Sequence, residues 1–303
     1  MRRLSIVVVT LALPALAAPA DAGPLKVVTT TEDLAAIARA VGGDAVQVRS
    51  ITKGSQDPHH VDAKPSFMAR LRRADLLIYV GLQLEVGWLP LLIDGARNPD
   101  IRPGRRGHLD ASVGVPVLGR PEGEVDRSQG DVHPEGNPHY WLDPRNGLRI
   151  AASVTERLAE LAPDRAAELR ARGGAFQERL KARIAAWEAK AARLKGLEVV
   201  TYHATYAYLA RWLGLKVAAQ VEERPGIPPS PRHVAALVRQ MRRHAVPILV
   251  SSGFAPPAVT ARVAGKASAK HIVLPASVGG AAGVDSYEAL IDHAVGVLLE
   301  AAP

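Results

Sequence analysis

Short β-branched runs alternate with helical patterns along most of this chain, and this alternation constrains the fold more than any other feature. In the first half the pattern predicts strands at 26–30, 46–52, 75–81 and 109–118, and helices at 33–41 and 66–73. Strands separated by single helices are typical of βαβ units, which build a mainly parallel sheet flanked by helices.

The second half repeats this pattern, with strands predicted at 197–202, 215–221, 246–251 and 271–274 and helices at 204–213, 231–244, 258–265 and 285–301. Between the halves, apolar residues from Phe176 to Leu194 recur every three or four positions, which predicts one long helix. The 303 residues therefore read as α/β, with two lobes that each hold a mainly parallel sheet and are joined by a linker helix. We expect a signal peptide at 1–22, an N-terminal lobe at 23–163, the linker at 164–196 and a C-terminal lobe at 197–303.

The first 22 residues indicate the compartment. Arg2 and Arg3 precede an apolar stretch, and Ala20-Asp21-Ala22 offers a cleavage site of the small-x-small type. The stretch is shorter than a membrane-spanning helix and Pro14 interrupts it, which favours a cleaved signal peptide over a retained anchor. The sequence has no cysteine, which excludes thiolate metal sites and a lipid-modified cysteine. We therefore expect a soluble periplasmic protein.

The formal charge of +8 raises nucleic acid or an anionic membrane as partners. However, the basic clusters at 70–73, 102–106 and 242–244 are short and have no interleaved aromatics, so solvated faces explain them better and no nucleic-acid partner is expected. The sequence also lacks the His-Glu-x-x-His, Gly-x-Ser-x-Gly and Walker motifs. These enzyme classes have no support here.

Three histidines stand where a parallel sheet binds ligands. His59 and His203 follow predicted strands, and His139 lies at the exit of a polar loop at 119–137. Taken singly, each is more often a hydrogen-bond partner of a loop than a metal ligand. His60 is an alternative to His59, and the role of His133 in the loop stays open.

Asp285 precedes Glu288 by three residues, and Asp-Ser-Tyr-Glu is typical of a capping box at the start of the last helix. By its sequence pattern alone, Asp285 is expected to be an N-cap rather than a metal ligand.

Four segments together resemble the metal-binding subunits of zinc and manganese ABC importers, the TroA-like or cluster A-I family. The resemblance covers nearly all of the chain after the predicted signal peptide. It rests on Asp57-Pro-His59 with Leu84-Glu-Val-Gly-Trp88, on Asn137-Pro-His-Tyr-Trp-Leu-Asp-Pro144, on Tyr202-His203-Ala-Thr-Tyr, and on Asp285-Ser-Tyr287.

This resemblance implies that His59, His139, His203 and Asp285 form one metal site between the lobes, with two ligands from each lobe. Three imidazoles and one carboxylate suit zinc, and manganese binders of the family usually have an acidic residue where His203 stands. The implied role is capture of zinc as a transported ligand and its delivery to a membrane permease, without catalysis. A periplasmic metallochaperone is a further candidate partner, and we expect a monomer.

Three alternatives stay open: a manganese importer subunit, a secreted zinc-dependent hydrolase, and an adhesin. The chain also departs from the family in two places. Its 119–137 loop holds a single histidine, His133, among acidic residues, and is interpreted as a flexible acidic loop rather than a collector of metal. A glutamate common in the family near Ser251 is missing, which is expected to change the groups around the ligands.

Overall fold

A computed structural model describes residues 23–123, 125 and 129–303 of the chain. The predicted signal peptide at 1–22 lies outside these residues. Within the described part, none of the helices combines the length and the apolar character needed to cross a membrane.

The N-terminal lobe contains one parallel sheet in the order β2-β1-β3-β4. Its strands are β1 (Leu25–Thr29), β2 (Val46–Ser50), β3 (Leu76–Tyr79) and β4 (His108–Asp110), and its helices are α1 (Glu32–Gly42), α2 (Pro65–Leu71), α3 (Leu89–Ala96) and α4 (Pro144–Leu161). Helix α4 begins at Pro144, a residue suited to the first turn of a helix, and the Asp143 carboxylate caps it by accepting from the Arg145 amide.

The C-terminal lobe repeats this topology with a parallel sheet in the order β6-β5-β7-β8. Its strands are β5 (Glu198–Thr201), β6 (Lys216–Gln220), β7 (Ile248–Ser252) and β8 (Lys270–Leu274), and its helices are α6 (Ala207–Leu213), α7 (Pro231–Arg243), α8 (Pro257–Ala267) and α9 (Tyr287–Ala301). The two-lobed α/β architecture predicted from the sequence is confirmed.

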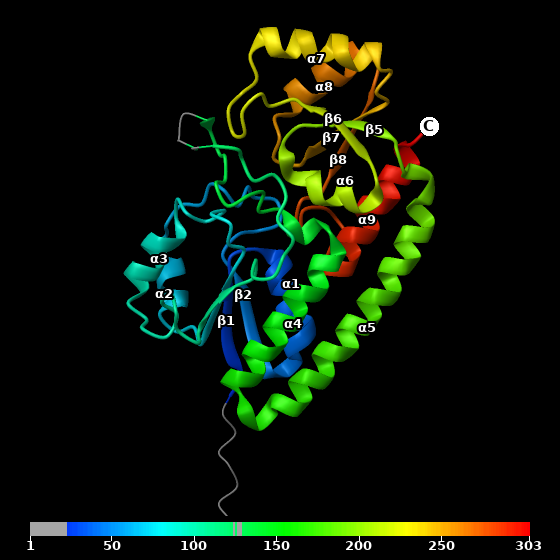
Figure 1. Ribbon diagram of the computed structural model, residues 1–303. Helices are drawn as coiled ribbons and strands as arrows, with labels where there is room; N and C mark the ends of the chain where they lie inside the picture. The colour runs from blue at the N-terminus through cyan, green and yellow to red at the C-terminus, as the bar shows by residue number, and fades with distance from the viewer. Residues whose placement is uncertain (1–22, 124, 126–128) are drawn as a thin grey trace, which may run out of the picture.

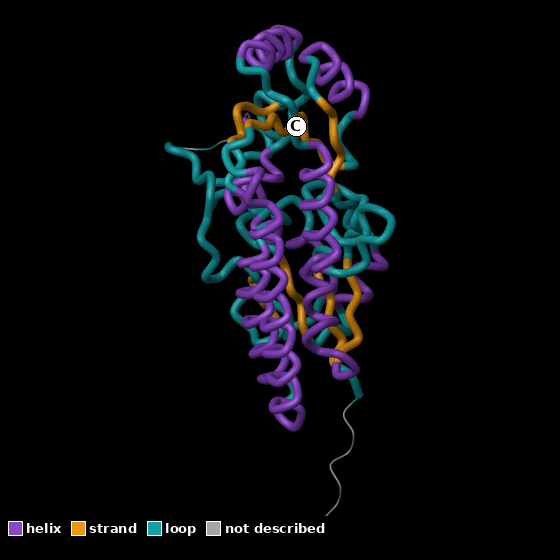
Figure 2. Tube along the Cα trace, turned by 90° about the vertical axis from the view of Figure 1, so that its right-hand side faces the viewer, coloured by secondary structure: helices purple, strands orange, loops and turns teal. Residues whose placement is uncertain are grey.

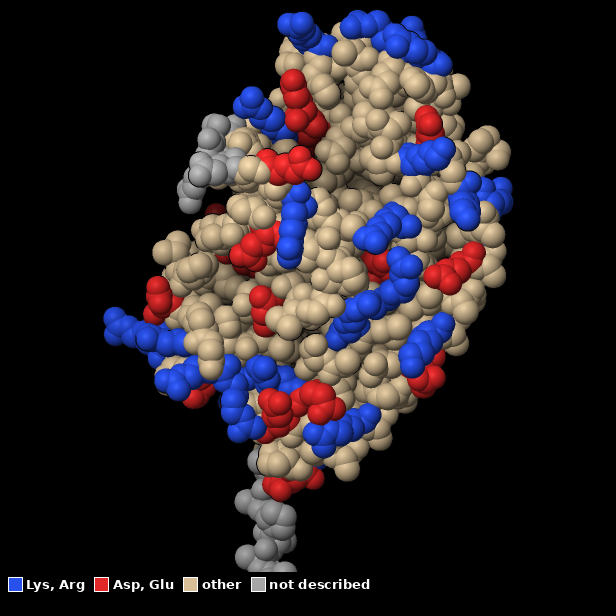
Figure 3. Space-filling model, viewed as in Figure 1, with Lys and Arg blue, Asp and Glu red and all other residues tan. Residues whose placement is uncertain are grey.

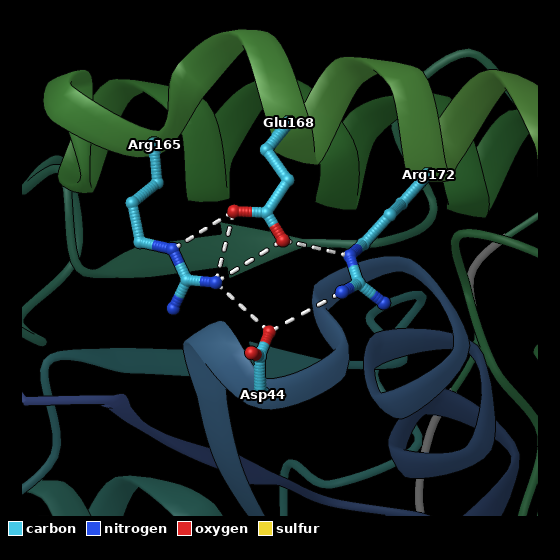
Figure 4. Close-up of polar contacts among 4 residues, drawn as sticks. All are labelled: Asp44, Arg165, Glu168 and Arg172. Atoms are coloured by element: carbon cyan, nitrogen blue, oxygen red, sulfur yellow. Dashed lines mark hydrogen bonds and ion pairs between the residues drawn. The ribbon is translucent and has the colours of Figure 1, made fainter.

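The predicted long helix is α5 (Ala166–Ala191), which runs along the side of both lobes and packs on α4 (Figures 1 and 2). Its first turns are joined to the N-terminal lobe by Asp44, whose carboxylate accepts from Arg165 at 2.8 Å and Arg172 at 3.4 Å (Figure 4). Glu168 accepts from the same two arginines, so the four charges form one surface network. On the face shown in Figure 3, Lys and Arg side chains are interspersed with Asp and Glu. In the other half of α5, the Trp187 indole donates to Asp292 of α9 at 2.9 Å.

One hydrophobic core runs through both lobes rather than ending at the boundary between them. It includes Val27 and Ile78 of the first sheet, Trp187 of α5, and Val250 of the second sheet. The Tyr287 hydroxyl of α9 donates to the carbonyl of Trp141 in the N-terminal lobe at 2.6 Å, and both side chains are buried. Because this core is continuous, a wide hinge opening would expose apolar surface at a large cost.

One local prediction was wrong, and one helix was not predicted. The strand predicted at 109–118 is only the three-residue β4, because Gly114 adopts a positive φ of 79° and Pro116 lacks a ladder donor. Helix α3 was missed, because eight residues with Pro90 in the first turn carry little periodic signal.

Candidate metal centre

His59, His139 and His203 come together from three separate loops. His59 lies in the loop after β2, His139 immediately precedes the short 3-10 turn Tyr140–Leu142, and His203 follows the carboxyl end of β5. One nitrogen from each ring lies within 4.8 Å of the corresponding nitrogens of the other two. Among the described residues, this is the group of histidines and acids with metal-binding spacing. His59 and His139 belong to the N-terminal lobe and His203 to the C-terminal lobe.

The Nδ1 atom of each imidazole lies within hydrogen-bond distance of a side-chain oxygen atom. Asp57 Oδ1 lies 2.6 Å from Nδ1 of His59, Asn137 Oδ1 lies 2.9 Å from Nδ1 of His139, and Glu222 Oε2 lies 2.7 Å from Nδ1 of His203. A ring whose Nδ1 donates to an oxygen has its Nε2 lone pair available for a metal. The arrangement therefore selects the tautomer that presents Nε2 at all three positions.

The Nε2 atoms of His59 and His139 are buried and have no hydrogen-bond partner among the described residues. An unsatisfied buried nitrogen costs about 1–3 kcal/mol, and a bound cation would remove that cost. Burial, together with the neighbouring imidazoles, holds the pKa of His139 well below its usual value. His139 is therefore neutral at neutral pH, as a metal ligand has to be.

The loops that carry the ligands are fixed by their neighbours. The Trp88 indole donates to the carbonyl of Pro58, directly before His59, at 3.0 Å. The Asn137 side-chain amide donates to the Ala204 carbonyl, directly after His203, at 2.8 Å. Asn137 therefore orients one ligand and ties its loop to the opposite lobe.

His59 and His203 border a cavity of about 230 Å³ between the lobes, lined also by Asp57, Glu222, Ser252 and Phe254. His60 also lines this cavity, but its side chain is 68% exposed, its Nε2 lies 3.3 Å from Asp131, and it is not one of the three histidines with metal-binding spacing. Of the two neighbouring histidines, His59 is therefore the better candidate for a metal ligand.

His133, left open by the sequence, lies beside His59, but it stands outside the group of three histidines whose ring nitrogens lie within 4.8 Å of one another. Its ring centroid is 5.2 Å from that of His59, and its Nε2 atom is buried without a partner among the described residues. Burial, with the nearby His59 and His203, lowers the pKa of His133 to about 4. The loop end that carries it is held to the C-terminal lobe, since the Asp131 amide donates to the Pro225 carbonyl at 2.8 Å.

The structure does not bring Asp285 to the histidines. Asp285 is exposed and lines a separate pocket with Glu32, Arg39 and Lys53. The capping prediction for Asp285 was also wrong by one residue, because Ser286 is the N-cap of α9 and accepts from the Ala289 amide at 3.1 Å. Helix α9 starts two residues after Asp285, and packing of Tyr287 under the N-terminal lobe leaves Asp285 on the outer side.

Sequence reasoning missed Asp57 and Glu222 as the partners of the ligands. Glu222 follows β6 by two residues, so the rule that ligands gather at the carboxyl ends of strands could have identified it. Ser251, near which the family resemblance implies a glutamate, has its hydroxyl 2.8 Å from Nε2 of His271.

Two parallel-sheet lobes, a connecting helix and three histidines contributed by both lobes, with His139 buried, define a metal-binding protein of the solute-binding type. The chain belongs to the family described as zinc-uptake complex component A, periplasmic, whose model matches residues 27–301. The resemblance found in the sequence motifs is confirmed.

Several curated relatives match over most of the chain. The zinc-binding lipoprotein AdcA of Streptococcus pneumoniae is 25% identical over 224 residues, which are 74% of this chain and 44% of AdcA. This chain thus spans less than half the length of AdcA. The manganese ABC transporter substrate-binding lipoprotein PsaA of Streptococcus pneumoniae is 28% identical over 232 residues, or 74% of this chain and 71% of PsaA.

Solved structures share the fold. A crystal structure of ZnuA aligns with a TM-score of 0.75 at 21% identity, covering 91% of this chain and 98% of the other. The manganese-bound periplasmic metal-binding protein of Candidatus Liberibacter asiaticus aligns with a TM-score of 0.75 at 20% identity, with the same coverage.

Proposed function

We propose that this protein captures zinc between its lobes and delivers it to the permease of an ABC importer. The observation that carries this proposal is the convergence of three imidazoles from both lobes, two of them with buried and unpartnered Nε2 atoms. The names of its relatives, zinc-binding and manganese transporter proteins, support a role in metal import. We place the protein in the periplasm, where it acts as a monomer that meets the permease and receives zinc from solution or from a metallochaperone.

We propose zinc rather than manganese as the cargo. Neutral imidazole nitrogens suit zinc, whereas manganese prefers carboxylate, carbonyl and water oxygens. In this site the nearest carboxylates, those of Asp57 and Glu222, are engaged with the Nδ1 atoms of His59 and His203. They orient ligands instead of binding the ion.

We propose His133 as the fourth zinc ligand in place of Asp285. Its Nε2 atom is buried, unpartnered and close to His59, whereas Asp285 lies exposed in another pocket. Four nitrogen ligands close a tetrahedral site and leave no position for an activated water. The site then binds and releases zinc without hydrolytic chemistry. Since the core is continuous through both lobes, release follows from movement of the 129–137 loop and small shifts of the lobes.

The first experiment is a competitive titration of the metal-free protein with zinc against a chromophoric chelator, repeated with manganese. One tight zinc equivalent, with manganese binding at least about a hundredfold more weakly, is the expected result. Absence of a tight zinc site would overturn the three-histidine assignment. Tighter binding of manganese than of zinc would show that the cargo of this site is manganese.

A pair of variants tests the fourth ligand. His133→Gln is expected to weaken zinc binding by about tenfold to a hundredfold while leaving one equivalent bound. His60→Gln is the matched control, because His60 lines the same cavity as His59 with a side chain that is 68% exposed, whereas the Nε2 atom of His133 is buried. Unchanged affinity in His133→Gln would remove His133 from the ligand set and leave the three-histidine site standing.

A further inference from the structure

A cationic groove lies on the outer side of the N-terminal lobe, away from the histidines. It has a volume of about 330 Å³, and four of its lining residues are Lys26, Arg49, Arg70 and Arg73. The lining contains no aspartate or glutamate and shares no residue with the cavity at the metal centre. We refer to it as the basic groove.

The sheet register explains how these cations meet. β1 and β2 are parallel neighbours in which Lys26 pairs with Gln47 and Val28 pairs with Arg49. Alternate residues of a strand share one face, so Lys26 and Arg49 project from the same side of the sheet. Helix α2 supplies Arg70 and the residues after it supply Arg73, which form the facing wall of the groove. Figure 1 shows β1, β2 and α2 in the same lobe.

The side chains of the four cations form no ion pair with a carboxylate, although the backbone amide of Lys26 donates to the Asp75 carboxylate at 2.7 Å. None of the ion pairs among the described residues includes Lys26, Arg49, Arg70 or Arg73. In contrast, Arg165, Arg170 and Arg172 on the same lobe's border all pair with acids. Like charges around one concavity repel, and a bound anion would relieve that repulsion.

Arg70 is held in place before any ligand binds. Its guanidinium donates to the Ser50 carbonyl at 3.3 Å and lies 5.5 Å from the centroid of the Phe67 ring. A planar guanidinium fixed in this way is suited to bidentate recognition of phosphate or carboxylate oxygens. The groove thus combines one guanidinium in fixed geometry with cationic side chains that form no ion pair among the described residues.

We propose that the basic groove binds a multiply charged phosphate group. Three guanidinium groups and one ammonium match the several oxygens and charges of a diphosphate better than those of a single carboxylate. Two sources offer this chemistry, a free polyphosphate-like anion and the headgroups of an anionic phospholipid surface. This site is independent of zinc binding, since the two cavities have separate linings.

The test is calorimetric titration of the metal-free full-length protein with inorganic pyrophosphate, so that no bound metal can mediate binding. We expect one site whose affinity falls at least about tenfold in the double variant Arg49→Gln/Arg73→Gln. The control is Arg102→Gln/Arg105→Gln, which removes the same charge from an exposed turn of the same lobe. Zinc affinity should be unchanged in both variants, which shows that they are folded.

A second arm separates the two sources. Sedimentation with vesicles of phosphatidylglycerol in phosphatidylcholine measures binding to headgroups, with pure phosphatidylcholine vesicles as the blank. Groove-dependent binding of pyrophosphate alone identifies a free anion, and groove-dependent binding of vesicles identifies a headgroup. Binding of neither probe, or equal loss in the groove and control variants, overturns the proposal.

Discussion

Glu222 accepts a hydrogen bond of 2.7 Å from Nδ1 of His203, and its same carboxylate oxygen accepts from the Gly226 amide at 3.1 Å. The glutamate thereby links the only histidine of the trio that belongs to the C-terminal lobe to the loop that follows β6. Such partners fix the ring orientation and raise the basicity of a ligand nitrogen.

Replacing this carboxylate should weaken zinc binding without removing the site. Glu222→Gln is expected to lower zinc affinity by about tenfold to a hundredfold, because the neutral amide polarises His203 less. The chelator competition described above measures it. Glu223→Gln is the control, since Glu223 is an exposed neighbour of the same charge. Equal losses in both variants would show that net charge, rather than the His203 contact, sets the affinity.

The raised pKa of Asp33 predicts that the free energy of unfolding of the protein falls as the pH rises. Its buried carboxylate accepts from the Ser277 hydroxyl at 2.6 Å and the Val278 amide at 3.0 Å, both in the opposite lobe. Burial raises the pKa of Asp33 from 3.8 to about 7. The folded state then keeps a proton that the unfolded state loses, so the contribution of Asp33 is largest below about pH 4 and declines towards about pH 7.

Asp33→Asn removes this titration. Urea unfolding of both proteins between about pH 4 and pH 7 should show the wild type losing stability relative to the variant as the pH rises. Burial also raises the pKa of Glu85 to about 7. Because Glu85 is present in both proteins, its contribution to the pH dependence cancels in the comparison. A constant difference across this range would mean that Asp33 titrates alike in the folded and unfolded states.

The pH dependence of zinc binding should identify the contribution of His133. Its pKa is lowered to about 4, so in the metal-free folded protein it stays neutral and ready to bind until the pH approaches that value. The affinity ratio of wild type to His133→Gln should be constant from about pH 7 to pH 5 and shrink towards one near pH 4. A ratio that collapses near the ordinary histidine pKa of about 6.5 would contradict the burial of this side chain.

Tyr287→Phe tests how firmly α9 joins the two lobes. The variant removes the hydroxyl that donates to the Trp141 carbonyl and leaves that buried acceptor without its donor. Unfolding free energy should fall by about 1–3 kcal/mol, whereas zinc affinity stays within about twofold of the wild type. Urea denaturation of the metal-free protein measures the first quantity. A large loss of zinc affinity instead would show that this contact sets the position of the ligands.

Much of the fold was predictable because its signals are local. The spacing from Phe176 to Leu194 identified the long helix, since helical periodicity acts within a few residues. The brief strand β4 and helix α3 were missed or misjudged because segments of three and eight residues carry too few positions to reveal a period.

Some residues of the candidate site were likewise predictable from the sequence, and others were not. The sequence by itself determined three candidate histidines, because strand ends and motif residues mark His59, His139 and His203. Only the tertiary structure decided that His133 lies beside them and that Asp285 does not. The path of the loop before His139 and the packing of α9 set those two positions. Both depend on contacts between distant segments, such as the Asp131 amide with the Pro225 carbonyl and the Tyr287 hydroxyl with the Trp141 carbonyl, which no local pattern records.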